Sequence, residues 1–212
     1  MTLDNFHTEE MMFNSCKPAL LIVDVQQAID CFSPYKRNNP SAEEKIASLL
    51  ARWRHASLPV VHVRHSSKFL DSPYHQCSAG FPFKQSVAPI GDELVVTKSE
   101  NCAFINTDLE QILFEQEISE IIICGVLCNN SIDATVRVAS GLGFHVYLPH
   151  DTTAAFPMQT LNGKQFSGED IHWIFISNLD KEYCRVCSSE QILDACRKLP
   201  KLNSSDLFSS LK

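Results

Sequence analysis

The stretch ISEIIICGVLCNNSIDATVRVASGLGFHVYL, residues 118–148, decides the fold prediction. Its first part, residues 118–126, contains a nearly continuous apolar run, which is typical of a strand covered on both faces. A helix is predicted over residues 129–140, because apolar side chains share one stripe there and two glycines follow directly. A second apolar strand is predicted over residues 144–148. Two strands joined by a helix indicate a parallel pair.

The same alternation of strands and helices extends along the chain in both directions. Further strands are predicted over residues 19–25, 58–63, 93–98 and 183–187. Further helices are predicted over residues 42–55, 108–116, 169–179 and 189–199. A long stretch with Ser, Pro and Gly, residues 66–91, has no clear period and is predicted to be a functional loop. The fold class is therefore α/β, a three-layer α/β/α domain with a mostly parallel central sheet of Rossmann-like type.

Length and charge limit the class of protein. The chain has 212 residues, 44% of them apolar, with 25 acidic and 18 basic side chains. It is too apolar for a disordered chain, and a net charge of −7 argues against a nucleic-acid surface, which needs clustered Lys and Arg. No apolar run approaches the length of a transmembrane helix, and the acidic start of the chain does not resemble a secretory signal. We expect a cytoplasmic protein without a nucleic-acid or membrane partner.

The chain is predicted to form one domain. Residues 17–199 carry the strand and helix pattern, without a repeat, a low-complexity tract or a linker that would divide them. Residues 1–16 are predicted to be an N-terminal extension, and residues 200–212 a loosely held C-terminal tail.

Nine cysteines are scattered along the chain, and several lie inside apolar runs. Such spacing in a chain of this size is not that of a disulfide scaffold, so we expect reduced thiols. Cys184 and Cys187 have CxxC spacing, but no second pair accompanies them. In a strand, residues three apart point to opposite faces, so structural thiols are favoured over a zinc or redox site.

Polar residues follow three of the predicted strands, at the edge of the sheet where ligands bind in open α/β folds. Asp24 ends the first strand, Lys98 ends the third, and the sequence GVLCNNS, residues 125–131, follows the fourth where a helix begins. A nucleophile there would gain from the helix dipole and from backbone N–H groups. Taken singly, each residue is more readily explained by a structural role, as a helix cap, a turn or a solvated lysine. The three together at strand ends make a catalytic site as good an explanation. We expect Asp24 and Lys98 to lie in a polar cleft, so that replacing either by Ala removes activity with little loss of stability.

These motifs resemble those of the isochorismatase-like cysteine hydrolases. This family includes isochorismatase, nicotinamidase, N-carbamoyl amidases and streptothricin-hydrolase-like enzymes. The resemblance spans residues 18–199, and the motifs that carry it are LLIVDVQQA, VVTKSENCAFINTDL, ICGVLCNNSIDATVRVASGLGFHV and SGEDIHWIFISNLDKEY. It implies a small-molecule hydrolase, most similar to the amidase and streptothricin-hydrolase branch, that cleaves an amide or other C–N bond. It also implies a homo-oligomer.

The resemblance implies a role for each matching position. Asp24 matches the general base, and Lys98 matches the residue that polarises the base and the nucleophile. The Val126–Leu127 peptide matches a cis bond that does not involve proline. The backbone N–H groups of Leu127 and Ser131 match the oxyanion hole.

Ser131 departs from the family motif, which has Cys at this position. A thiol ionises far more readily than a hydroxyl, and an ordinary carboxylate is a poor base for a serine. Four explanations are open: a natural substitution in an enzyme whose reaction needs no thiolate, such as enol-ether hydrolysis; a change introduced to trap substrate; a weak serine nucleophile assisted by Lys98; or a catalytically silent binding protein. Cys128, three residues earlier, is a further candidate nucleophile.

No metal or other cofactor is expected. The nicotinamidase branch carries an Asp-x-His metal group after the second strand, whereas this chain has His62-Val-Arg-His65 there. The residues His65 to Pro73, HSSKFLDSP, are loosely similar to the metal-free amidase branch. Residues that flank the motifs are candidates for the lining of the substrate pocket, although aromatic side chains are as often core. These candidates are Gln26, Phe32, Phe81, Phe83 and Phe104.

Overall fold

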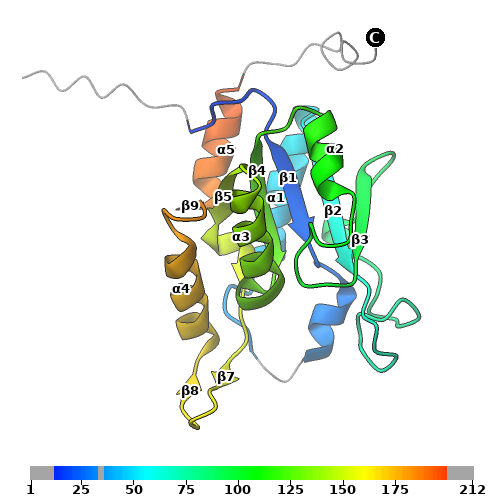
Figure 1. The fold of residues 1–212 in the computed structure, drawn as a ribbon, viewed down its shortest axis with the longest axis vertical. Helices are drawn as coiled ribbons and strands as arrows, with labels where there is room; N and C mark the ends of the chain where they lie inside the picture. Colours follow the sequence, from blue (N-terminus) through cyan, green and yellow to red (C-terminus); the bar gives the residue numbers. More distant parts are fainter. Residues whose placement is uncertain (1–11, 33–35, 200–212) are drawn as a thin grey trace, which may run out of the picture.

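The computed structural model describes residues 12–32 and 36–199, which form a parallel sheet between two layers of helices (Figure 1). Within these residues the sheet has seven strands, in the order β3-β2-β1-β4-β5-β9, with β6 paired beside β4. Their bounds are β1 Ala19–Val23, β2 Val60–His65, β3 Leu94–Lys98, β4 Glu120–Val126, β5 His145–Pro149, β6 Thr153–Ala154 and β9 Arg185–Cys187. Every pair in this sheet is parallel, which confirms the predicted fold class.

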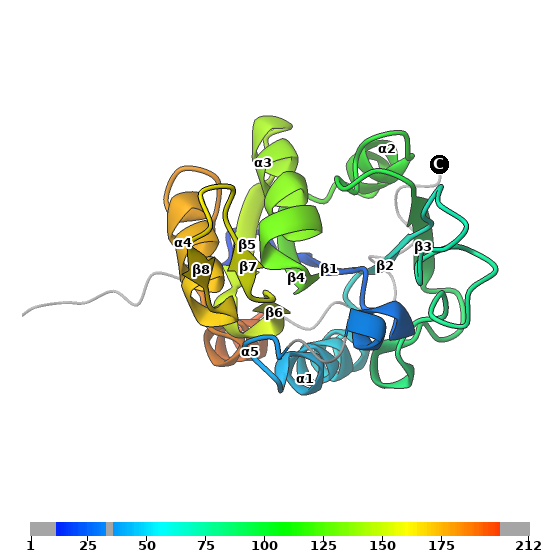
Figure 2. The same ribbon diagram turned by 90° about the horizontal axis from the view of Figure 1, so that it is seen from below.

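Helices cover both faces of the sheet (Figure 2). One face carries α1 Ala42–His55 and α5 Ser189–Arg197. The other carries α2 Leu109–Glu115, α3 Asp133–Gly141 and α4 Gly168–Leu179. This separation into two layers follows from the two-residue period of the strands, since neighbouring side chains point to opposite faces.

The central strand β1 shows how the two cores are divided. All five of its residues are buried. Leu20 and Ile22 pack with α1 and α5, while Leu21 and Val23 pack with the three helices of the other face. A continuous apolar run is therefore required at this position, because both faces of the strand are covered.

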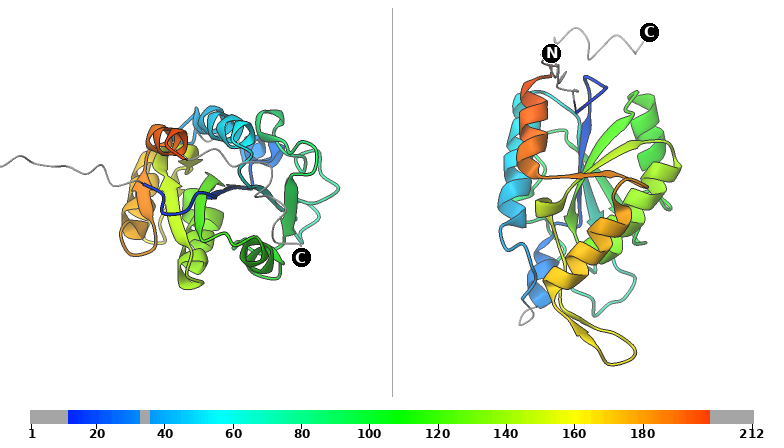
Figure 3. Two further views of the ribbon diagram at one scale, coloured as in Figure 1. Left: turned by 90° about the horizontal axis from the view of Figure 1, so that it is seen from above. Right: turned by 90° about the vertical axis from the view of Figure 1, so that its left-hand side faces the viewer.

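The structure adds short elements that the sequence pattern does not predict. A two-stranded antiparallel hairpin, β7 Met158–Gln159 with β8 Gln165–Phe166, projects from the domain below α4 (Figure 3, right). Short 3₁₀ turns, η1, η2 and η4, cover Gln27–Phe32, Gln85–Val87 and His150–Thr152. The helix predicted from residue 129 begins with a wider π turn, η3 Cys128–Ile132, before α3. Strands of two residues and single turns are too short to show a period, so apolar spacing does not predict them.

Part of the predicted N-terminal extension packs onto the domain. Phe13 is 3% exposed, and its ring lies edge-on to the rings of Trp53 and Tyr147, with centroids 6.5 and 5.1 Å away. The backbone N–H groups of Asn14 and Ser15 donate to the buried carboxylate of Glu120 over 3.0 and 2.6 Å. Residues 12–15 therefore belong to the folded unit, while residues 1–11 and 200–212 lie outside the described part.

The nine cysteines are free thiols. Cys184 packs in the core between the sheet and α2, α3 and α4, whereas Cys187 packs in the core on the opposite face. The CxxC pair therefore points to two sides of the sheet, as predicted, and the two thiols have separate structural roles. No helix in the described part of the chain is long and apolar enough to cross a membrane.

Candidate active site

The carboxyl ends of four neighbouring strands form one edge of the sheet, and polar side chains gather there. Asp24 directly follows β1, His65 is the last residue of β2, and Lys98 is the last residue of β3. His65 and Lys98 are partners in the β2–β3 register. Ser131 reaches the same edge from the turn after β4.

Asp24 ends β1 with a sharp change of backbone direction. Its φ of +57° lies in the left-handed region, which Asp tolerates better than most residues. Its backbone N–H donates to the Val63 carbonyl over 2.8 Å, so the turn is fixed to the neighbouring strand. The carboxyl group is thereby held at the sheet edge instead of continuing the strand.

The Lys98 ammonium joins the base to the candidate nucleophile. Its Nζ donates to Oδ2 of Asp24 over 2.7 Å and to Oγ of Ser131 over 3.2 Å. A third bond, of 3.1 Å, goes to the backbone carbonyl of Glu100. The structure therefore brings Asp24, Lys98 and Ser131 together.

The Asp24–Lys98 ion pair is buried, which corrects part of the expectation of a polar cleft: Asp24 lines a cavity, whereas Lys98 does not. The side chains of Lys98 and Asp24 are 0% and 5% exposed. Removing one partner from such a pair leaves an unpaired charge in a low-dielectric environment, which is strongly destabilising. Substitution of Asp24 or Lys98 alone is therefore expected to cost stability, contrary to the prediction from sequence.

Burial also changes the chemistry of the carboxyl group. Desolvation raises the pKa of Asp24 above its ordinary value of 3.8, although the positive charge and hydrogen bond of Lys98 oppose this shift. A carboxylate with a raised pKa is a stronger base than an exposed one. Its Oδ1 atom is buried without a hydrogen-bond partner in the structure.

The turn after β4 holds Ser131 in place. The carbonyl of Leu127 accepts hydrogen bonds from the N–H groups of Asn130 and Ile132 over 3.1 and 3.2 Å. The Val126–Leu127 peptide bond is cis, as the resemblance implies. Gly125 has a φ of +126°, and a Cβ atom there would lie 2.0 Å from the Val23 carbonyl oxygen. Only glycine therefore allows β4 to approach β1 this closely just before the turn.

A cavity of about 220 Å³ lies over these residues. It is lined by Asp24, Ile29, Phe32, His65, Tyr74, Asn101, Val126, Leu127, Asn130 and Ser131. Lys98 forms no part of this lining and is 1% exposed, so it acts on the cavity through Asp24 and Ser131.

The residues proposed from sequence for the pocket lining divide into two groups. Phe32 lines the cavity, whereas Gln26, Phe81, Phe83 and Phe104 do not. Gln26 is fully buried, and its amide N–H₂ donates to the carbonyls of His65 and Phe81 over 3.1 and 2.7 Å. Gln26 therefore links the end of β2 to the loop at Phe81, and it does not face the cavity.

The three remaining aromatic side chains pack elsewhere. Phe81 lies under the guanidinium of Arg64, and the Phe83 ring packs against His62. Phe104 is buried in the core of the α2–α3 face. Closeness to a motif in sequence did not distinguish these positions from Phe32.

The scan against family models matches the isochorismatase domain over residues 18–191. The chain belongs to the isochorismatase family. Members of this family are hydrolases, and this isochorismatase-family chain is therefore an enzyme of that type.

Individual relatives agree with this assignment. The isochorismatase-family protein YrdC of Bacillus subtilis is 36% identical over 178 residues, which cover 84% of this chain and 95% of YrdC. A streptothricin hydrolase of Streptomyces noursei is 34% identical over 140 residues, which cover 65% of this chain and 50% of that enzyme. An isochorismatase-family protein from Chromobacterium violaceum, whose crystal structure is known, is 43% identical in sequence to this chain. It superposes with a TM-score of 0.85, covering 87% of this chain and 96% of the other.

Several cavity residues of this isochorismatase-family enzyme were not singled out from sequence as site residues, and His65 and Tyr74 carry the largest polar rings among them. The sequence pattern gives His65 no role at the site, although its place at the end of a strand is a signal of the same kind as that of Lys98. Tyr74 comes from the long loop over residues 66–91, whose sequence has no period that could place it. The Tyr74 ring packs against Phe32 and His65, with centroids 6.3 and 5.8 Å away.

The described residues place no metal-binding group at the site, and the thiol nearest to Ser131 in sequence is buried. Within residues 12–32 and 36–199, no group of three or more His, Cys, Asp or Glu side chains is placed to hold a metal ion. His62 bonds to Glu93 over 2.8 Å. Cys128 is fully buried, and desolvation raises the pKa of its thiol to about 12. A thiol with this pKa is protonated at neutral pH, which favours Ser131 over Cys128 as the candidate nucleophile.

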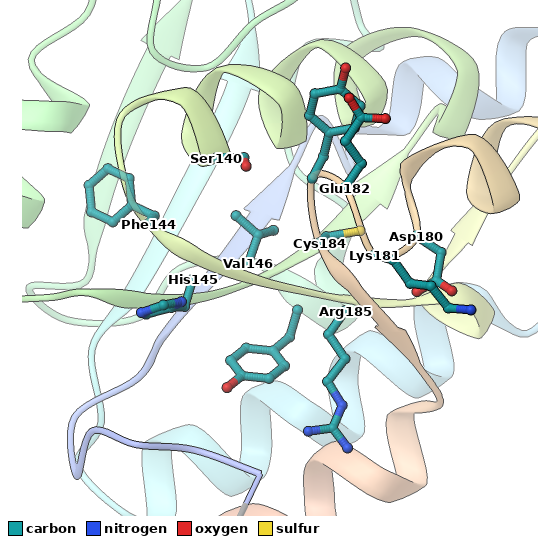
Figure 4. A pocket seen from close by; sticks show the side chains of 11 residues that line it. Ser140, Phe144, His145, Val146, Asp180, Lys181, Glu182, Cys184 and Arg185 are labelled. Carbon is teal, nitrogen blue, oxygen red and sulfur yellow. The ribbon is translucent and has the colours of Figure 1, made fainter.

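A second cavity of the enzyme, of about 330 Å³, lies at the opposite edge of the sheet (Figure 4). His145 and Arg185, the first residues of β5 and β9, line it together with the loop that carries Asp180, Lys181 and Glu182. In parallel α/β sheets, ligands bind at the carboxyl ends of the strands. The candidate active site is therefore the cavity at Asp24, not this one.

Proposed function

We propose that the enzyme hydrolyses the C–N bond of a small amide, with Ser131 as nucleophile, Asp24 as general base and acid, and Lys98 between them. The single observation that carries the proposal is the position of the Lys98 Nζ atom. It lies 2.7 Å from the Asp24 carboxylate and 3.2 Å from the Ser131 hydroxyl, and both of these groups line one cavity.

The first half of the reaction forms an acyl-enzyme. The Asp24 carboxylate takes the hydroxyl proton of Ser131 while Oγ forms a bond to the amide carbon, and the carbonyl electron pair moves to oxygen. The carbonyl then re-forms, the C–N bond breaks, and the amine leaves with the proton that Asp24 had accepted. Lys98 stabilises the negative charge on Asp24 and on the developing alkoxide of Ser131.

The second half hydrolyses the ester. Asp24 takes a proton from water while the hydroxide oxygen bonds to the acyl carbon. The bond from that carbon to Oγ breaks, and Oγ regains the proton from Asp24. The products are a carboxylic acid and an amine, and the enzyme returns to its starting state.

Backbone groups at the cavity are assigned to the oxyanion. Leu127 and Ser131 both line the cavity, and their N–H groups are the ones that the family resemblance assigns to the oxyanion hole. Donors placed where charge develops contribute most to the acceleration of acyl transfer.

Asp24 is a stronger base toward the Ser131 hydroxyl than its sequence alone implies. An ordinary carboxylate is a weak base for serine, but burial raises the pKa of Asp24. The relative named streptothricin hydrolase supports hydrolytic chemistry at this site, since it is 34% identical over 140 residues of this chain.

The test combines activity with stability, because single substitutions in a buried ion pair also destabilise. Asp24→Asn and Lys98→Met are each expected to lower kcat by about 10²–10⁴ on small amides, measured as ammonia release. Each is also expected to lose about 3 kcal/mol of unfolding free energy. The double variant Asp24→Asn/Lys98→Met removes both charges and is expected to regain most of that stability without regaining activity.

Asp92→Asn is the matched control, because Asp92 is exposed and lies beside β3 at the opposite edge of the sheet. Asp92→Asn should leave both kcat and the free energy of unfolding unchanged. Full ammonia release by Asp24→Asn would contradict the proposal. An unmodified chain that binds amides but releases no ammonia from any of them would establish the competing function, a catalytically silent binding protein.

A further inference from the structure

Two buried polar atoms of the described cavity lining have no hydrogen-bond partner among the protein atoms. They are Oδ1 of Asp24 and Nδ1 of His65. Both residues line the cavity of about 220 Å³, and Asp24 is only 3% exposed. A buried polar atom without a partner loses free energy of hydration that no contact in the fold offsets. Two such atoms in one cavity lining therefore indicate that a small polar molecule binds there.

The remaining contacts of Asp24 and His65 hold both side chains in place. Oδ2 of Asp24 accepts a hydrogen bond from Lys98 Nζ over 2.7 Å, which fixes the carboxylate. The backbone N–H of His65 donates to Oε1 of Gln26 over 2.8 Å. The His65 ring lies edge-on to the Tyr74 ring, with centroids 5.8 Å apart. Protein contacts therefore position both groups and leave Asp24 Oδ1 and His65 Nδ1 to a ligand.

The protonation of His65 makes its Nδ1 atom an acceptor. Desolvation and the positive charge of Lys98 hold the pKa of the ring below its ordinary value of 6.5, so the ring is neutral at pH 7. A hydrogen bond to the backbone of Glu100 favours the protonated ring, so the ring is the donor in it. Because Nδ1 has no protein partner, this bond uses Nε2. Nε2 then carries the proton of the neutral ring, and Nδ1 keeps a lone pair.

A water molecule matches these two acceptors. It can donate one O–H to the Asp24 carboxylate and the other to His65 Nδ1, and its lone pairs then point away from both. Ser131 lines the same cavity, and its Oγ carries the acyl group in the proposed reaction. A water held in this way has one proton on the base and its lone pairs in the cavity that contains the acyl carbon.

We propose that His65 is a further catalytic residue, whose Nδ1 atom together with Asp24 Oδ1 holds the water that hydrolyses the acyl-enzyme. The inference rests on the proposed function, since it concerns the second half of that reaction. Asp24 Oδ1 takes one proton of the water while the water oxygen bonds to the acyl carbon. The bond from that carbon to Ser131 Oγ breaks, and Oγ regains the proton from Asp24. The hydrogen held by His65 stays on the acid product, which ionises after release.

An activated ester separates the two halves of the reaction. p-Nitrophenyl acetate acylates the same nucleophile, and its release of p-nitrophenolate measures kcat and kcat/KM, of which kcat/KM does not contain the deacylation step. His65→Phe removes Nδ1 and keeps a ring against Tyr74. We expect its kcat to fall at least about tenfold with kcat/KM unchanged, because the water is no longer oriented. Acetyl-Ser131 should accumulate in its mass spectrum during turnover.

Two further substitutions move an acceptor within the same side chain. His65→Asn places its amide oxygen close to the position of Nδ1 and is expected to recover most of the lost kcat. His65→Gln places the oxygen near the position of Nε2 and is expected to show the loss, which also provides the test if His65→Phe does not fold. His55→Phe, at the exposed end of α1 on the opposite edge of the sheet, is the matched control and should leave both constants unchanged.

The outcomes separate this assignment from the proposed function. Unchanged constants in His65→Phe would overturn the role of His65, and so would equal kcat values in His65→Asn and His65→Gln. A fall of kcat/KM in parallel with kcat would show that His65 has only a structural role. Each of these results leaves the proposed function in place. A lack of acetyl-Ser131 in both the unmodified chain and His65→Phe would instead contradict the proposed function, and the role of His65 with it.

Discussion

Ser131 lies beside the Lys98 ammonium and the Asp24 carboxylate, at the position where the family resemblance implies a thiol. Replacing Ser131 by Cys changes one atom and should leave the fold intact. The new thiol would lie close to a buried cation, which lowers a thiol pKa below its free value of about 8.5. We expect Ser131→Cys to react with iodoacetamide at least about tenfold faster than Cys128, as measured by mass spectrometry of the labelled peptides.

Cys128 is the internal control for this experiment, because it lies three residues away with a thiol pKa raised to about 12. The same variant should raise amide hydrolysis, since a thiolate needs less help from a weak base than a hydroxyl does. An introduced thiol that labels no faster than Cys128 would mean that Lys98 does not act on position 131, and the assignment of the nucleophile would fail.

Glu93 connects three elements at the amino edge of the sheet. It precedes β3, and its carboxylate accepts two hydrogen bonds from Arg54 of α1, of 2.7 and 2.8 Å, and contacts His62 of β2 over 2.8 Å. Although burial opposes the shift, these hydrogen bonds lower the pKa of Glu93 to about 2. The network therefore holds a helix and two strands together only while Glu93 is ionised.

The pH dependence of stability follows from this shift. The pKa of Glu93 is lower in the folded chain than its ordinary value of 4.5. The unfolded chain therefore binds the proton first as the pH falls. The stabilisation is complete above pH 4.5 and is lost progressively between about pH 4.5 and pH 2. We expect chemical denaturation at several pH values to show that Glu93→Gln is less stable at neutral pH and depends less on pH across this range.

The exposed Glu115→Gln on α2 is the control for this comparison, and it should retain the pH dependence of the unmodified chain. A Glu93→Gln variant with an unchanged slope between pH 4.5 and 2 would show that Glu93 does not cause the acid sensitivity.

At the scale of elements, the long periodic segments could be predicted and the short ones could not. The helix predicted over residues 42–55 is α1 at the same bounds, because its apolar stripe repeats over several turns. The β7–β8 hairpin has strands of two residues, which no period can reveal. At the site, the ends of strands located Asp24 and Lys98, since that rule depends only on topology. The burial of their ion pair depends on the residues packed around it, which sequence spacing does not show.

At the scale of the whole molecule, the chain before β1 is part of the folded unit. Phe13 packs against Trp53 of α1 and Tyr147 of β5, so it joins elements that are far apart in sequence. We expect Phe13→Ala to cost about 3 kcal/mol of unfolding free energy, because it leaves a cavity in this core. Denaturant unfolding monitored by circular dichroism measures the loss.

Phe69→Ala removes the same side chain from a position that is 75% exposed, and should change stability little. A Phe13→Ala variant as stable as Phe69→Ala would restore the sequence-based view that residues 1–16 are an extension outside the domain.

The three hydrogen bonds of Lys98 also bear on the proposed reaction cycle. Its ammonium has both Asp24 and Ser131 among its acceptors, so it stays close to the negative charge whichever of the two carries it. The proposed reaction can therefore pass through both of its halves without movement of the lysine.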